Sequence, residues 1–163
     1  MSAVLRLALL TLVLSPPCAI AGTDVLSPEG YGPVRFGMKV EEVELALKQR
    51  TTEPYIAAGC DYVEFKKYPG LRFMVEDGVV TRADARGNIR NSAKVLVGMN
   101  LAKVRAMHPS VKVEPHKYDD EGHYLILDTN DGRAAIVLEE SKGKVIAVRA
   151  GMKPAVKYVE GCL

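Results

Sequence analysis

The chain has 163 residues, of which 22 are Lys or Arg and 20 are Asp or Glu, and it contains no Trp. This length fits one domain or two small units and excludes a large multidomain assembly. The near balance of charges argues against a nucleic-acid-binding protein that depends on a basic surface. The apolar fraction of 48% is inflated by the N-terminus, because only 63 of the 142 residues after position 21, about 44%, are apolar. That lower value is ordinary for a soluble domain.

Residues 1–21 have the features of a secretory signal peptide. One Arg precedes an apolar run, and small residues follow that end at Ala21. We expect cleavage after Ala21, which leaves a mature chain, 22–163, with no transmembrane anchor, in the periplasm or outside the cell. A lipid-modified Cys18 is the alternative, although two prolines precede it where such sites have small residues.

Cleavage would remove one of the three cysteines and leave Cys60 and Cys162. An even pair in an exported protein predicts a disulfide. It would close a loop of about 100 residues, which the chain-entropy estimate values at roughly 4–5 kcal/mol. We therefore expect a structural bridge that holds the C-terminal tail, 152–163, against the first half of the chain.

Two segments of the mature chain, 34–43 and 95–104, resemble each other. Each has an apolar lead-in, a Gly-Met pair and then apolar residues at helical spacing. The expected apolar helix face of the first segment is Val40, Val43 and Leu47. The second segment has a shorter stripe of Leu101, Val104 and either Met107 or His108. This pattern predicts an internal repeat, with units at about 32–87 and 93–151.

Strand patterns follow each predicted helix. Val outnumbers Leu in the mature chain, and Asp77-Gly78 is a strong hairpin signal between two of the runs. The expected strands are 61–65, 71–76, 79–85, 123–127, 133–139 and 144–150. We expect an α+β fold in which two tandem helix-plus-three-stranded antiparallel units share one sheet, with the helices packed on one face. Residues 22–163 would form this single domain.

The Gly-Met element that opens a helix before three antiparallel strands resembles the repeat of the β-lactamase-inhibitor-protein-like superfamily. That superfamily includes outer-membrane assembly lipoproteins of the SmpA/OmlA type. The resemblance covers roughly Gly32 to Gly151 and implies a binding role. The chain departs from the lipoproteins at Cys18, and it has one long-range cysteine pair instead of a bridge in each unit. The resemblance transfers no catalytic residue.

The segment 115–124 is the most unusual in composition. It gathers two of the three His residues, three consecutive acidic residues and two Tyr residues. A recognition loop, a solvated loop and a metal site with imidazole and carboxylate ligands are the alternatives. The binding residues we select are His116, Tyr118, Asp119, Asp120, His123 and Tyr124, and we assign no metal ligand.

Basic residues also recur near the end of the first half, at Lys66, Lys67, Arg82, Arg86 and Arg90. We interpret them as a solvated strand surface, since alternate strand residues share a face. Binding of an anionic glycan or lipid head group is the alternative.

No serine-hydrolase elbow, zinc-protease motif, phosphate loop or dinucleotide fingerprint is present in the sequence. We therefore assign no catalytic residue and no cofactor. The expected function is an exported non-catalytic module that binds another envelope or extracellular protein, with inhibition of a hydrolase as one form of that role. An envelope-assembly factor and a small-ligand or glycan-binding protein are the alternatives. The sequence leaves the oligomeric state open.

Overall fold

The computed structural model describes residues 24–162. The predicted signal peptide, 1–21, and the alternative lipid site at Cys18 lie outside the described residues. None of the helices in the described part is long and apolar enough to cross a membrane.

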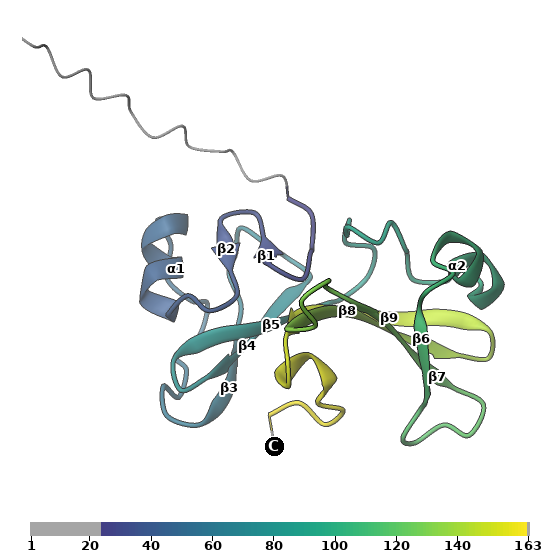
Figure 1. The fold of residues 1–163 in the computed structure, drawn as a ribbon. Helices are drawn as coiled ribbons and strands as arrows, with labels where there is room; N and C mark the ends of the chain where they lie inside the picture. The colour runs from purple at the N-terminus through teal and green to yellow at the C-terminus, as the bar shows by residue number, and fades with distance from the viewer. Residues whose placement is uncertain (1–23, 163) are drawn as a thin grey trace, which may run out of the picture.

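A seven-stranded antiparallel sheet forms the body of the molecule (Figure 1). Its strand order is β3-β4-β5-β9-β8-β7-β6, so the first half of the chain supplies one side and the second half supplies the other. The strands are β3 (Cys60–Val63), β4 (Leu71–Glu76), β5 (Val79–Ala85), β6 (Lys112–Pro115), β7 (His123–Asp128), β8 (Ala134–Ser141) and β9 (Lys144–Met152). A separate two-stranded ribbon of β1 (Gly30–Tyr31) and β2 (Val34–Arg35) precedes them.

The expected α+β fold of two tandem helix-plus-three-stranded units is wrong. Strands account for 38% of the structure and helices for only 13%. The two α-helices, α1 (Val40–Leu47) and α2 (Leu101–Met107), have about two turns each. The second half also contains four strands instead of three, because β6 adds an edge to the sheet. Helices this short cover little of the sheet, so the sheet defines the architecture.

Several local predictions are nevertheless confirmed. Val40, Val43 and Leu47 are the buried residues of α1, as their spacing predicts. The hairpin between β4 and β5 turns through Asp77 and Gly78, with φ values of 48° and 77°. Two consecutive positive φ values are the mark of a type I′ turn, which matches the twist of the flanking strands.

The two faces of the sheet are covered differently (Figure 1). The main core lies on the face that carries the helices, where α1 and α2 pack over side chains such as Phe73, Leu125, Ile136 and Leu138. A short 3₁₀ turn, η1 (Ala155–Lys157), and the rest of the C-terminal segment lie on the other face, which we call the tail face.

The β5–β9 pairing joins the two halves. Its register sets Arg82 opposite Gly151, Ala83 opposite Ala150 and Asp84 opposite Arg149. Because strand side chains alternate between faces, the two fully buried alanines point into the main core. The charged side chains of this seam therefore point to the tail face.

Candidate functional site

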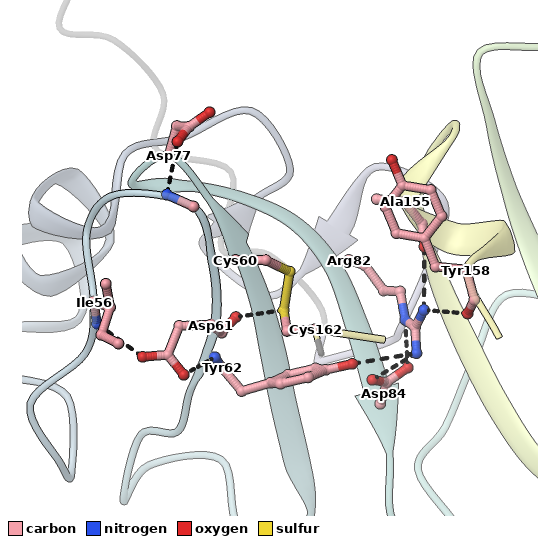
Figure 2. Close-up of a disulfide and its surroundings, with 11 residues drawn as sticks. Ile56, Cys60, Asp61, Tyr62, Asp77, Arg82, Asp84, Ala155, Tyr158 and Cys162 are labelled. Carbon is pink, nitrogen blue, oxygen red and sulfur yellow. Dashed lines mark hydrogen bonds and ion pairs between the residues drawn. A yellow bond between two sulfur atoms is a disulfide. The ribbon is translucent and has the colours of Figure 1, made fainter. Parts of the chain in front are cut away.

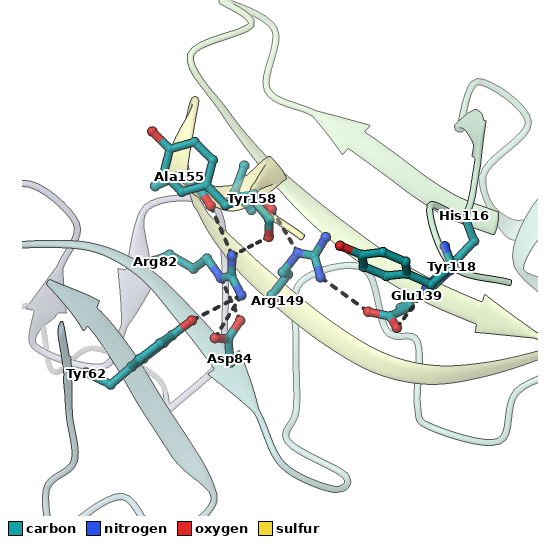
Figure 3. Close-up of polar contacts among 10 residues, drawn as sticks. Tyr62, Arg82, Asp84, His116, Tyr118, Glu139, Arg149, Ala155 and Tyr158 are labelled. Carbon is teal, nitrogen blue, oxygen red and sulfur yellow. Dashed lines mark hydrogen bonds and ion pairs between the residues drawn. The ribbon is translucent and has the colours of Figure 1, made fainter. Parts of the chain in front are cut away.

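The tail face carries a charged cluster at the seam between the two halves (Figure 3). Arg82 on β5 is its first member and is only 4% exposed. Its guanidinium donates two hydrogen bonds to Asp84, from Nε to Oδ1 at 2.7 Å and from a terminal nitrogen to Oδ2 at 3.0 Å. This bidentate arrangement is the strong form of an Arg–carboxylate pair.

Arg82 also holds the C-terminal segment in place. One terminal nitrogen donates to the backbone carbonyls of Ala155 and Tyr158, at 3.1 and 2.8 Å. A buried cation is costly unless its donors are satisfied. The C-terminal segment thus supplies the remaining hydrogen-bond acceptors of Arg82 and shields its guanidinium from water.

Arg149 on β9 is the matching residue of the second half and is 7% exposed. Its Nε donates to the carbonyl of Val156 at 2.8 Å, and a terminal nitrogen donates to Glu139 at 3.3 Å. Burial, with the positive charge of Arg82 nearby, lowers the pKa of Arg149 below its ordinary value. Each half of the sheet therefore contributes one buried arginine that donates hydrogen bonds to the same C-terminal segment.

The predicted bridge between Cys60 and Cys162 is present at the far end of this segment (Figure 2). It links residues 102 positions apart and fastens the chain end to edge strand β3. Tyr62, two residues after Cys60, lies beside the bridge, and its hydroxyl is 3.5 Å from Arg82. The disulfide and the charged cluster thus form one continuous anchor.

The predicted loop residues reach the charged cluster through His116. Its Nε2 lies 3.0 Å from Glu139, the carboxylate that Arg149 also contacts. Its ring stacks on Tyr124, with centroids 4.6 Å apart. The structure therefore brings His116 and Tyr124 together on the tail face.

His123 lies on the other face of the sheet. It pairs with Glu140 in the β7–β8 ladder, and its Nδ1 is 2.7 Å from the buried carboxylate of that residue. Tyr124 pairs with Glu139 one position further along. Since neighbouring strand residues point to opposite faces, the sheet separates the partners of the two histidines.

The remaining predicted residues lie around the loop. Tyr118 is 67% exposed, and its hydroxyl contacts the carboxylate of Glu160 on the C-terminal segment, which Lys117 also contacts. Asp119 accepts a hydrogen bond from the Ser141 hydroxyl at 2.6 Å, and this bond lowers the pKa of Asp119. Asp120 is exposed.

The metal alternative gains no support from this arrangement. Within residues 24–162, no three His, Cys, Asp or Glu side chains gather closely enough to hold an ion. Hydrogen bonds from Lys117 and Tyr118 lower the pKa of Glu160 to about 2, so this carboxylate serves to hold the loop to the C-terminal segment.

Two small hollows open on the tail face, and Val159 lines both of them. The first, here called the arginine hollow, has a volume of about 190 Å³, and its charged lining is Arg72, Arg82, Asp84, Glu139 and Arg149. The second, here called the tyrosine hollow, measures about 200 Å³, and its lining includes Tyr124, Ile126, Val137 and Lys117. Each is smaller than the 300–1,000 Å³ typical of drug-sized ligand sites. They have the size to receive single side chains or very small molecules.

The interpretation of Arg82 as part of a solvated strand surface is wrong. Arg86, the residue that follows this strand, does have an exposed side chain. Arg82 differs because the C-terminal segment covers it, which no local pattern reveals. Two features of the sequence could have indicated that Arg82 is buried. Arg82 and Asp84 share one face of a strand, and Cys162 was expected to hold the C-terminal tail against this half of the chain. Glu139 and Arg149 carried no such signal.

Comparisons of the chain with protein-family models, with curated proteins and with solved structures return no match.

Proposed function

We propose that the mature chain is an exported, non-catalytic module that binds another envelope or extracellular protein through its tail face. The disulfide between Cys60 and Cys162 is compatible with export, since such bridges persist in oxidising compartments. The resemblance of its Gly-Met elements to a family of inhibitors and assembly proteins points in the same direction.

The observation that carries this proposal is the pair of hollows beside Val159. Protein interfaces gain most of their energy from a few side chains that enter well-formed pockets. The apolar walls here come from Ile126, Val137 and Val159, and charged groups surround them. Disulfide and arginine contacts hold the segment that carries Val159, so the surface is preorganised and loses little entropy on binding.

Exposed tyrosines extend the same face. Tyr118 is 67% exposed beside the tyrosine hollow, and Tyr158 is 36% exposed on the C-terminal segment. Tyrosine offers a large contact area with a polar tip and few rotatable bonds, which favours it in recognition surfaces. The acidic loop residues Asp120 and Glu121 are also exposed and would complement a basic partner.

The test is affinity capture from periplasmic extract with the purified mature protein, followed by titration of any captured protein after its purification. Two variants alter the tail face: Tyr118→Ala removes an aromatic anchor, and Val159→Asp places a charge in the lining of both hollows. Leu45→Asp is the matched control, since Leu45 is 78% exposed on α1, over the opposite face.

We expect the wild type and Leu45→Asp to bind the same partner, and each tail-face variant to bind it at least tenfold more weakly. Circular dichroism establishes that each variant is folded. Capture of no partner at micromolar concentration would contradict the proposal. So would a partner that Tyr118→Ala and Val159→Asp retain with full affinity.

A further inference from the structure

We propose that the arginine hollow is a binding site for a small carboxylate, with the guanidinium of Arg72 as its principal donor. The hollow has three guanidinium groups and two carboxylates in its lining. An anionic ligand of one charge would therefore balance it. The same hollow is one of the two assigned above to a protein partner, but the carboxylate site is inferred from the groups that line it and does not rest on that proposal.

The two carboxylates of the hollow already have partners. Asp84 receives both of its hydrogen bonds from Arg82. Glu139 contacts His116 through one oxygen and Arg149 through the other. Asp84 lies opposite Arg72 in the β4–β5 register, but among the described residues the ion pairs of the two carboxylates are with Arg82, Arg149 and His116 and not with Arg72.

Arg72 is the arginine of the hollow that has no carboxylate partner among the described residues. Its guanidinium carbon lies 4.0 Å from the centre of the Tyr62 ring, a cation–π contact that holds the group beside the hollow. Among the described residues its Nε is buried and finds no hydrogen-bond partner. An unpaired buried N–H is unfavourable, and the same edge of the guanidinium carries a terminal N–H parallel to it. A carboxylate would bond both N–H groups of that edge after a rotation of the side chain exposes the Nε, which other atoms cover in this structure.

The surroundings strengthen the preference for an anion. Arg82 and Arg149 are both more than nine-tenths buried in the same lining. Within a site of low dielectric, these charges act on a ligand far more strongly than they would in water. A volume of about 190 Å³ admits a group of a few heavy atoms. A free metabolite-sized carboxylate and the carboxylate of a polypeptide both satisfy this chemistry.

The test uses the mature protein in chloride buffers of matched ionic strength, titrated with acetate, with N-acetylglycine and with N-acetylglycinamide. The readouts are calorimetric affinity and the ¹H–¹⁵N resonance of the Arg72 Nε. Arg72→Gln removes the donor. Arg105→Gln is the matched control, because Arg105 is exposed on α2, away from the hollow.

We expect acetate and N-acetylglycine to shift the Arg72 resonance, and the uncharged amide to leave it in place. Arg72→Gln should lose at least tenfold in affinity, while Arg105→Gln binds as the wild type does. A free small carboxylate as the natural ligand predicts equal affinities for the two acids; a polypeptide carboxylate predicts tighter binding of N-acetylglycine.

No shift with either acid would overturn the proposal, as would an equal shift with the amide or unchanged binding by Arg72→Gln. The resonance measurement needs only the wild type, so it decides the question even if Arg72→Gln fails to fold. If acetate binds but no protein partner is captured, the carboxylate site stands and the proposed function fails. If a partner is captured but acetate does not bind, the proposed function stands and the carboxylate site fails.

Discussion

Replacement of Arg82 by Met should destabilise the protein strongly. Arg82 is 4% exposed, and Met would keep an unbranched apolar side chain there while it removes the guanidinium that pairs with Asp84. The change leaves a largely buried carboxylate without its cation, and it leaves the carbonyls of Ala155 and Tyr158 without a donor. Loss of one partner of a buried ion pair costs about 3–5 kcal/mol. At roughly 2–4 °C per kcal/mol for a chain of this size, the melting temperature should fall by roughly 10 °C.

The assay is thermal and urea unfolding followed by far-ultraviolet circular dichroism, since the chain has no Trp to report by fluorescence. Arg86→Met is the matched control: its side chain is 60% exposed and pairs with Glu64, which is 44% exposed. Such a surface pair contributes about 1 kcal/mol or less. Equal destabilisation by the two variants would refute the reasoning that burial under the C-terminal segment sets the importance of Arg82.

Three further predictions concern the same region. Cys60→Ser combined with Cys162→Ser should lower the free energy of unfolding by up to about 4–5 kcal/mol, measured by urea unfolding; an unchanged midpoint would show that the bridge does not constrain the unfolded chain. Gly151→Ala should destabilise by about 1–3 kcal/mol, because a Cβ there would lie 2.5 Å from the Thr81 carbonyl oxygen; a wild-type urea midpoint would mean that the seam opens without cost. Because its pKa of about 2 in the folded state is below the ordinary 4.5, Glu160 stabilises the fold above about pH 4.5 and loses that contribution as the pH falls toward 2. Glu160→Gln should flatten the pH dependence of unfolding in that window, and an unaltered profile would argue against the contact.

Local patterns predicted the local elements well. The strands 71–76 and 79–85 coincide with β4 and β5, since alternation and a turn-forming Asp-Gly pair depend only on neighbouring residues. Strand β6 was missed because it has four residues and ends in Pro115. Proline is excluded from central strands but tolerated at a sheet edge, and only the folded sheet shows that this segment lies at an edge.

The fold class and the charged cluster could not be predicted in the same way. A helical repeat in the sequence does not indicate how much of the core its helices will cover. Likewise, Arg82 and Arg149 resemble ordinary surface residues of strands. Their burial depends on the C-terminal segment, which lies more than 70 positions beyond Arg82 in the chain. The predicted residue His116 belongs to the cluster through Glu139, a contact between the loop after β6 and strand β8 that neither local sequence specifies.

The C-terminal segment explains how the two halves of the sheet stay joined. Only four residue pairs connect β5 to β9, whereas eight connect β8 to β9. On the core side of this seam Ala83 and Ala85 stand opposite Ala150 and Val148. Three of these four side chains are alanines, which bury little apolar area. On the other side, Arg82 from the first half and Arg149 from the second half donate to the same segment. The disulfide then fastens that segment to β3. The contacts of the C-terminal segment with both halves therefore add to the small apolar contact between β5 and β9.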